Sequence, residues 1–186
     1  MLLSWVGWTD ETKITYLPGE EFIDKWGVLR RATEYDTPFG KGIYTELVGH
    51  PLADESKISS YKSPDPNKPE LYTGAEGLIR KYKDEYWIVG VAVTTMYETA
   101  WAMRGFEQMF IDFIENPDLV HAIFDIAWNY HFSIAKNLAS MGVDMIWIGD
   151  DVGAQNRMLI SPEIWRKYFK EKMGVFISLL KKINPE

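Results

Sequence analysis

Hydrophobic and polar positions follow two different patterns along the chain, and the change comes near residue 75. Residues 1–75 show no helical period and contain turn signals such as LPGEE, DTPFGKG and SPDPNKP. WVGW and GIYTELVG favour short strands, and EEFIDKWGVLRRAT favours a short helix or a pair of strands. We therefore expect a region of strands and loops, followed by a helix that begins near Pro69 or Thr73.

Beyond this point the pattern is that of alternating strands and helices. The run YWIVGVAVTT is continuously apolar and rich in β-branched residues, which is typical of a strand covered on both faces in a parallel sheet, and VDMIWIG is a second such run. The order predicts that strands at about 86–94 and 143–149 lie parallel in one sheet with helices outside it. Apolar residues spaced by three and four place those helices near 103–115, 117–141 and 162–183.

Composition narrows the class of protein. The 186 residues are 46% hydrophobic and 15% aromatic, which suits one domain over residues 1–186, divided into a strand and loop region (1–75) and βα units (76–186). The formal net charge is −7 with both signs interspersed, so nucleic acid is not expected as a partner. No apolar run is long enough to span a membrane, and the lack of cysteine fits a reducing compartment, so we expect a cytoplasmic protein.

The leading candidate catalytic residues follow the second predicted strand. Asp150 and Asp151 come directly after MIWIG, and the carboxyl ends of parallel strands form the ligand-binding edge of α/β folds. Two carboxylates at one site raise one pKa, which suits a general acid; the alternative is that one of them caps the loop by accepting backbone N–H bonds. Strand alternation from Ile146 and Ile148 favours Asp150 as the pocket-facing residue, and Gln155 adds a neutral substrate-binding group.

Further substrate-binding candidates follow the first predicted strand. Tyr97 or Glu98 is expected to reach the same edge as the aspartate pair, although Glu98 also suits the first turn of a helix, where the helix dipole favours an acid. Arg104 is a candidate to bind a substrate carboxylate, and the alternative is an ordinary ion pair on a helix surface. We expect one of the two aspartates to lie partly buried, within hydrogen-bonding reach of these residues.

The three histidines do not form a metal-binding pattern. His121 and His131 are ten residues apart on one predicted helix, and His50 lies far away in the sequence. Together with the lack of cysteine, this spacing predicts that the chain alone binds no metal.

Several segments resemble the uroporphyrinogen decarboxylase superfamily, and within it the cobalamin-dependent methyltransferases. They are FIDKWGVLRR, HPLADESKISSYKSPDP, AMRGFEQMFIDFIENPDLVHAIFD and GVDMIWIGDDVGAQNRMLISPEIWRKYFKEKM. The resemblance implies a (β/α)8 TIM barrel, and such a barrel takes roughly 250 residues. The expected fold class is therefore α/β, a partial barrel with an irregular N-terminal region.

The resemblance also implies an activity and partners. It implies methyl transfer between a corrinoid protein and a small acceptor, with decarboxylation of the acetate arms of uroporphyrinogen, or a non-catalytic fragment or assembly subunit, as alternatives. It implies zinc on a His-x-Cys pair and a later cysteine, ligands that this chain does not contain, and a corrinoid on a partner protein. Because an incomplete barrel exposes apolar surface, we expect a homodimer or completion by another chain.

Overall fold

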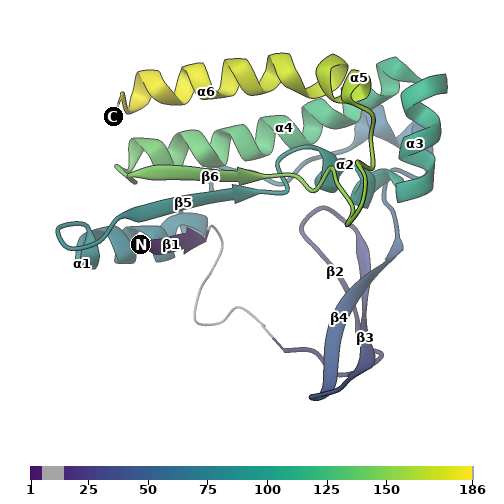
Figure 1. Cartoon of the computed structure of the whole chain (residues 1–186), viewed down its shortest axis with the longest axis horizontal. Coiled ribbons are helices and arrows are strands. Elements are labelled where there is room, and N and C mark those ends of the chain that lie inside the picture. The colour runs from purple at the N-terminus through teal and green to yellow at the C-terminus, as the bar shows by residue number, and fades with distance from the viewer. Residues whose placement is uncertain (6–14, 186) are drawn as a thin grey trace.

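A computed structural model describes residues 1–5 and 15–185 (Figure 1). Strands β1 (Leu2–Trp5), β5 (Ile88–Val93) and β6 (Met145–Gly149) form a parallel sheet in the order β1-β5-β6. The predicted parallel pair is confirmed, since β5 and β6 are neighbours and end at the same edge. β1 adds a third strand that overlaps WVGW at its first residue; the rest of that segment lies outside the described residues.

Helices follow the strands in the predicted order. Two short 3₁₀ helices, η1 (Glu55–Ser60) and η2 (Pro69–Tyr72), come before the first long helix. The α-helices are α1 (Thr73–Tyr82), α2 (Tyr97–Arg104), α3 (Phe106–Glu115), α4 (Pro117–Ser140), α5 (Pro162–Trp165) and α6 (Glu171–Ile183), with a π-helical turn, η3 (Arg166–Lys170), between the last two. None of the helices in the described part of the chain is long and apolar enough to cross a membrane.

Helix α4 packs closely on the sheet because β5 has a glycine at the contact. A Cβ atom on Gly90 would lie 2.9 Å from Cδ1 of Ile146 and 3.1 Å from Cβ of Leu138. The side of the sheet that carries Ile146 therefore faces the helices. Ile148 lies on the same side, since side chains alternate along a strand.

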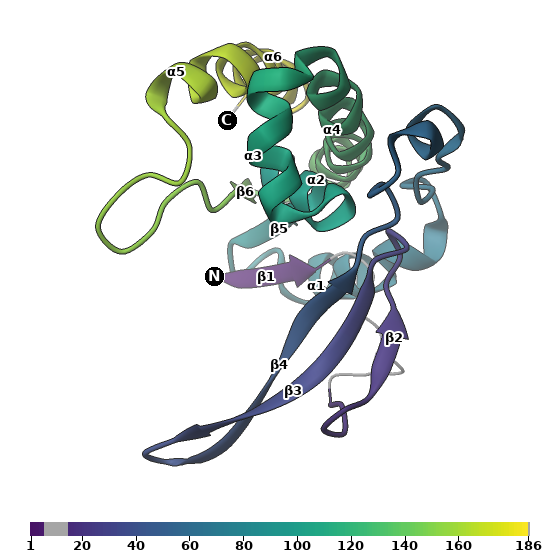
Figure 2. The same ribbon diagram turned by 90° about the vertical axis from the view of Figure 1, so that its right-hand side faces the viewer.

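A second sheet extends away from the helices (Figures 1 and 2). Strands β2 (Glu21–Ile23), β3 (Leu29–Thr37) and β4 (Gly40–Gly49) are antiparallel. EEFIDKWGVLRRAT is thus a pair of strands rather than a helix. We call the three strands the hairpin sheet.

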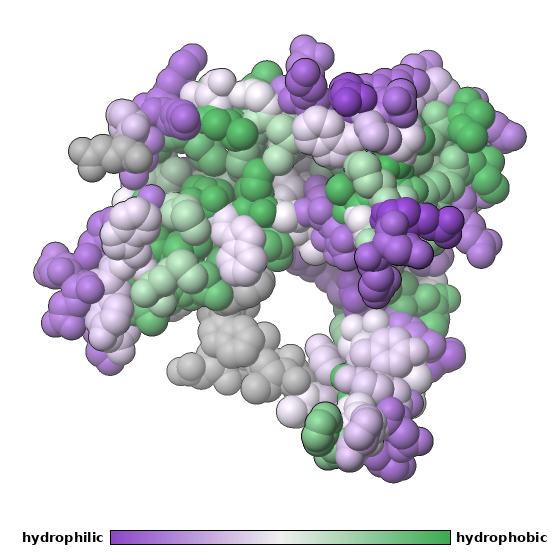
Figure 3. Space-filling view, viewed as in Figure 1, coloured by the Kyte–Doolittle hydropathy of each residue, from purple (hydrophilic) through white to green (hydrophobic). Residues whose placement is uncertain are grey.

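The described residues do not form a closed barrel. β6 pairs with β5 alone in the part of the chain that the structure describes, and Met145 and Trp147, on the side of β6 that faces away from the helices, are 41% and 44% exposed. Apolar side chains gather along β5 and β6 and beneath α6 (Figure 3), where a groove of about 240 Å³ separates β6 from α6. The expected exposure of apolar surface is confirmed, while a homodimer or completion by another chain stays a prediction.

Candidate functional site

The chain leaves β5 through a strained turn. Thr94 has φ 56°, and a β-branched residue with positive φ is a clear backbone outlier. Neighbouring hydroxyls hold the turn: that of Thr99 donates to the Thr94 carbonyl at 2.6 Å, and that of Thr95 donates to the Ala92 carbonyl at 3.0 Å. Strain of this kind is maintained by its surroundings and is common at ligand-binding sites.

Asp150 and Glu98 join the two loops that leave β5 and β6. The Asp150 carboxylate accepts the backbone N–H groups of Met96 (2.8 Å) and Glu98 (3.0 Å), so it caps the first turn of α2. In return, Oε2 of Glu98 accepts the backbone N–H of Asp151 at 3.2 Å. The two strand ends are therefore fixed to each other by reciprocal hydrogen bonds.

Strand alternation predicted that Asp150 shares a side with Ile146 and Ile148 and faces a pocket; the structure keeps the shared side but turns it toward the helices. Ile146 and Ile148 point toward the helices, and Asp150 continues on that side and meets the N-terminus of α2. This is the capping role considered as the alternative in the sequence. Asp151 is exposed, and its side chain accepts the backbone N–H of Gly153 at 3.3 Å.

The two loops that leave β5 and β6 form a rim, and the pKa of Asp150 in this rim is perturbed. Burial raises the pKa of Asp150 to about 6, against the effect of the backbone N–H groups it accepts, and the charge of Glu98 adds to the increase. Burial, with the charges of Asp150 and Asp151, also raises the pKa of Tyr97 to about 12. The Tyr97 ring is fully buried against Phe169, and its hydroxyl has no hydrogen-bond partner in the described structure. Tyr97 thus lies in the core beneath the rim.

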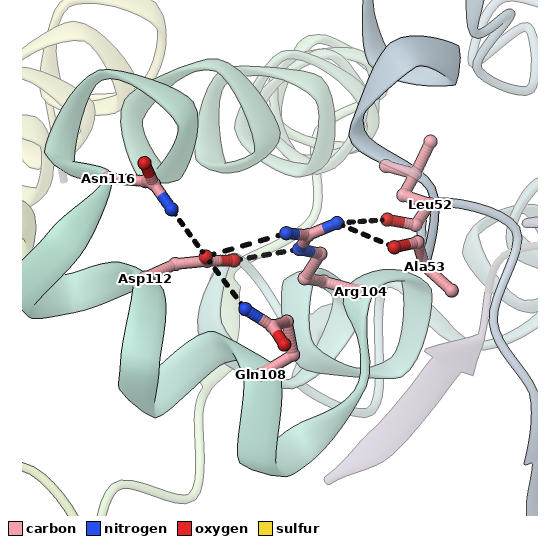
Figure 4. A network of polar contacts seen from close by, with 6 residues as sticks. All are labelled: Leu52, Ala53, Arg104, Gln108, Asp112 and Asn116. Atoms are coloured by element: carbon pink, nitrogen blue, oxygen red, sulfur yellow. Dashed lines mark hydrogen bonds and ion pairs between the residues drawn. The ribbon is translucent and has the colours of Figure 1, made fainter.

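Arg104 does not join this group, because it is buried at the opposite end of α2 (Figure 4). Its guanidinium donates to Asp112 at 2.7 Å and to the carbonyls of Leu52 (2.9 Å) and Ala53 (2.8 Å). Since Arg104 is 5% exposed and Asp112 is fully buried, the expectation of a surface ion pair is wrong. The guanidinium anchors the loop that follows the hairpin sheet.

Gln155 also lies apart from the aspartates. It is exposed near the tip of the loop between β6 and α5, and this loop projects outward (Figure 2). A bridge between Gly153 and Met158 holds the base of this loop.

A cleft of about 690 Å³ opens between α2 and the hairpin sheet, and its volume is in the range of small-molecule sites. Glu98 lies on one wall, and the opposite wall includes a turn that presents Lys25 and Trp26. Asp24 shapes this turn by accepting the backbone N–H groups of Trp26 (2.8 Å) and Val28 (3.1 Å). The cleft is lined by Tyr16, Phe22, Asp24, Lys25, Trp26, Arg30, Leu47, Thr94, Glu98, Thr99, Trp101 and Ala102.

A smaller cavity of about 180 Å³ shares Lys25 and Thr94 with the cleft and extends along β5 to Tyr130 and His131 of α4. Burial, together with the charge of Lys25, lowers the pKa of His131 to about 3, so the ring is neutral at pH 7. The Thr99 hydroxyl already donates to a carbonyl and lies 3.2 Å from Nε2 of His131. Nε2 must therefore carry the ring proton and donate it to Thr99.

The aromatic walls and Lys25 were not identified from the sequence. Lys25 and Tyr130 are 105 positions apart, and neither belongs to a recognisable motif. Lys25 lies in the segment FIDKWGVLRR, which resembles the family, but the resemblance assigns no role to this lysine.

A family model described as Uroporphyrinogen decarboxylase (URO-D) matches residues 34–186. No curated protein and no solved structure matches the chain significantly. The match covers the helices, β5, β6 and both loops of the rim.

Proposed function

Because the chain belongs to the uroporphyrinogen decarboxylase (URO-D) family, we propose that it contributes to an enzyme that transfers a methyl group between a corrinoid protein and a small acceptor. The acceptor binds in the cleft between α2 and the hairpin sheet. The corrinoid protein is the second substrate, and it approaches the same rim.

The charge of the cleft supports this activity over decarboxylation of uroporphyrinogen. Arg30 donates to Asp24 at 2.8 Å, which leaves Lys25 as the single cation without a salt bridge among the described residues that line the cleft. Glu98 brings an opposite charge to the other wall of the cleft. A porphyrinogen carries carboxylates on all sides, whereas the described lining of this cleft has no excess of positive charge and has aromatic walls, which suit a small and largely apolar ligand.

Glu98 is the residue best placed to act on the acceptor. A nucleophile such as a thiol or a hydroxyl loses its proton when it takes a methyl group, and a carboxylate beside it can accept that proton. One Glu98 oxygen is held by the Asp151 backbone, which orients the side chain. Asp150 is a positioning residue, because it fixes the first turn of α2, and Asp151 completes the rim.

The described residues do not fit the zinc site that the resemblance implies. The chain has no cysteine, and no three His, Asp or Glu residues gather as ligands in the part that the structure describes. We assign no step of the reaction to zinc held by these residues.

The proposal is tested by supplying the purified protein with methylcobalamin and a panel of small thiols and phenols. We expect the methyl–cobalt absorbance to disappear only when the protein is present. The rate of this loss should fall roughly a hundredfold in Glu98→Gln, since the variant cannot accept a proton. Glu115→Gln, at an exposed position of α3, is the matched control and should keep full activity.

A parallel assay measures carbon dioxide released from uroporphyrinogen III. Release without demethylation of methylcobalamin would replace methyl transfer by decarboxylation. Inactivity in both assays would favour a non-catalytic subunit and end the proposal.

A further inference from the structure

The junction of the cleft and the smaller cavity concentrates hydrogen-bond donors. Nζ of Lys25 donates to the Tyr130 hydroxyl oxygen at 3.2 Å and lies 4.7 Å from the centre of the same ring. The ammonium has two further N–H groups, and the Tyr130 O–H proton has no acceptor among the described hydrogen bonds. Three donors and one positive charge therefore meet at one place.

The surroundings compensate this charge only in part. Asp24, the nearest acid in the sequence, is occupied by Arg30 and by two backbone N–H groups. Although Lys25 reaches solvent, the protein around it lowers its pKa, and the charge of Asp24 opposes this change only in part. An anion bound beside Lys25 would favour the charged ammonium.

The donors are held in place by aromatic packing. Trp26 contacts the edge of Tyr130 with ring centres 4.9 Å apart and lies 5.7 Å from His131. Tyr130 and His131 are 3% and 5% exposed. The neutral His131 adds no second cation, so the site suits a single negative charge.

We propose that Lys25 and Tyr130 form a subsite for a carboxylate, so that the small molecule bound in the cleft is a monocarboxylate with an apolar body. The carboxylate accepts hydrogen bonds from the ammonium and the phenol, and the apolar body lies along Trp26 and Trp101 toward Glu98. The identification of this ligand with the methyl acceptor rests on the proposed function.

The test compares benzoate with its neutral isostere benzamide by isothermal titration calorimetry on the full chain. We expect benzoate to bind roughly tenfold or more tightly than benzamide, because charge-assisted hydrogen bonds are the stronger kind. Lys25→Met should weaken benzoate binding about tenfold to a hundredfold and weaken benzamide binding much less, because the neutral amide loses a hydrogen bond but no ionic attraction. Lys136→Met, on the exposed face of α4, is the control and should bind both as the unchanged protein does.

Tyr130→Phe gives an independent measurement, because it keeps the ring that contacts Trp26 and removes one donor. It should weaken benzoate binding by about threefold to tenfold. Equal affinity for benzoate and benzamide, an unchanged benzoate affinity in Lys25→Met, or no measurable benzoate binding at millimolar concentration would each overturn the subsite.

The two proposals fail separately. Benzoate binding that depends on Lys25, in a protein without methyl-transfer activity, would keep the subsite and remove the activity. Methyl transfer with a KM for a carboxylate acceptor that Lys25→Met leaves unchanged would keep the activity and remove the subsite.

Discussion

Each end of α2 holds a carboxylate from another segment, Asp112 fully buried and Asp150 half-buried, and the pKa values of the two shift in opposite directions. At the C-terminal end, burial acts to raise the pKa of Asp112, but hydrogen bonds from Arg104, Gln108 and Asn116 outweigh it and hold the pKa below its usual value. At the N-terminal end, Asp150 accepts backbone N–H groups and has no cationic partner among the described residues, and its pKa rises to about 6. The difference shows that one end is a satisfied structural anchor and that the other retains a perturbed acid hydrogen-bonded to Glu98, which lines the cleft.

The largest effect is expected from breaking the anchor. Arg104→Met leaves Asp112 buried without its cation and frees the carbonyls of Leu52 and Ala53, so the free energy of unfolding should fall by about 3–5 kcal/mol. Urea denaturation measures it. Arg31→Met breaks the ion pair between Arg31 and Glu21, whose side chains are 47% and 45% exposed. It should lower the free energy of unfolding by about 1 kcal/mol or less. Equal losses in the two variants would contradict the contrast between a buried and an exposed pair.

The second prediction concerns the pH dependence of stability at the other end of α2. The pKa of Asp150 rises from 3.8 to about 6 on folding, so between these pH values the folded protein binds more protons than the unfolded chain, and stability falls as the pH rises. Between about pH 4 and pH 7, the free energy of unfolding of the unchanged protein should fall by on the order of 2–3 kcal/mol more than that of Asp150→Asn. Parallel pH profiles for the two proteins would refute the raised pKa.

The sequence predicted the parallel strands and most helices because their apolar patterns are local. It did not place Arg104, because the apolar spacing near 103–115 predicts one continuous helix. Gly105, with φ 103°, ends α2 and starts α3 in a new direction, which brings Arg104 against Asp112 eight positions later. It did not place Asp150 either, since alternation says which residues share a side and not which side the helices cover.

The cleft was beyond prediction for a different reason. Its walls come from the hairpin sheet and from α2, and the donor pair of Lys25 and Tyr130 joins segments that are far apart in the sequence. Such proximity depends on how the sheet packs against the helices, and periodicity within either segment carries no information about it.

A third prediction tests the break between α2 and α3. Gly105→Ala should destabilise the protein by about 1–3 kcal/mol, because φ 103° and ψ 136° are accessible essentially to glycine alone. The added Cβ would lie 3.5 Å from His50, an ordinary contact, so the loss would reflect the backbone and not a clash. Gly77→Ala in α1 is the matched control; it meets open space and should stabilise the protein by roughly 0.5–1 kcal/mol. Stabilisation by both variants would show that the break tolerates a side chain.

The smallest effect is expected at Thr94, where relief of strain offsets losses. Removing a β-branched side chain from the left-handed region recovers about 1–2 kcal/mol, whereas glycine costs roughly 0.5–1 kcal/mol in backbone entropy. Thr94→Gly should therefore unfold with a free energy equal to that of the unchanged protein or up to about 1 kcal/mol higher.

Thr95→Gly has no such strain to relieve and loses a buried hydroxyl that donates to Ala92, so it should be destabilised by about 1–2 kcal/mol. Thermal unfolding of the two variants side by side makes the comparison, and a loss at Thr94 as large as that at Thr95 would mean that the turn at the end of β5 stores no strain. If Thr94→Gly is stable but binds ligand more weakly, the strain serves ligand binding, since Thr94 lines both the cleft and the smaller cavity.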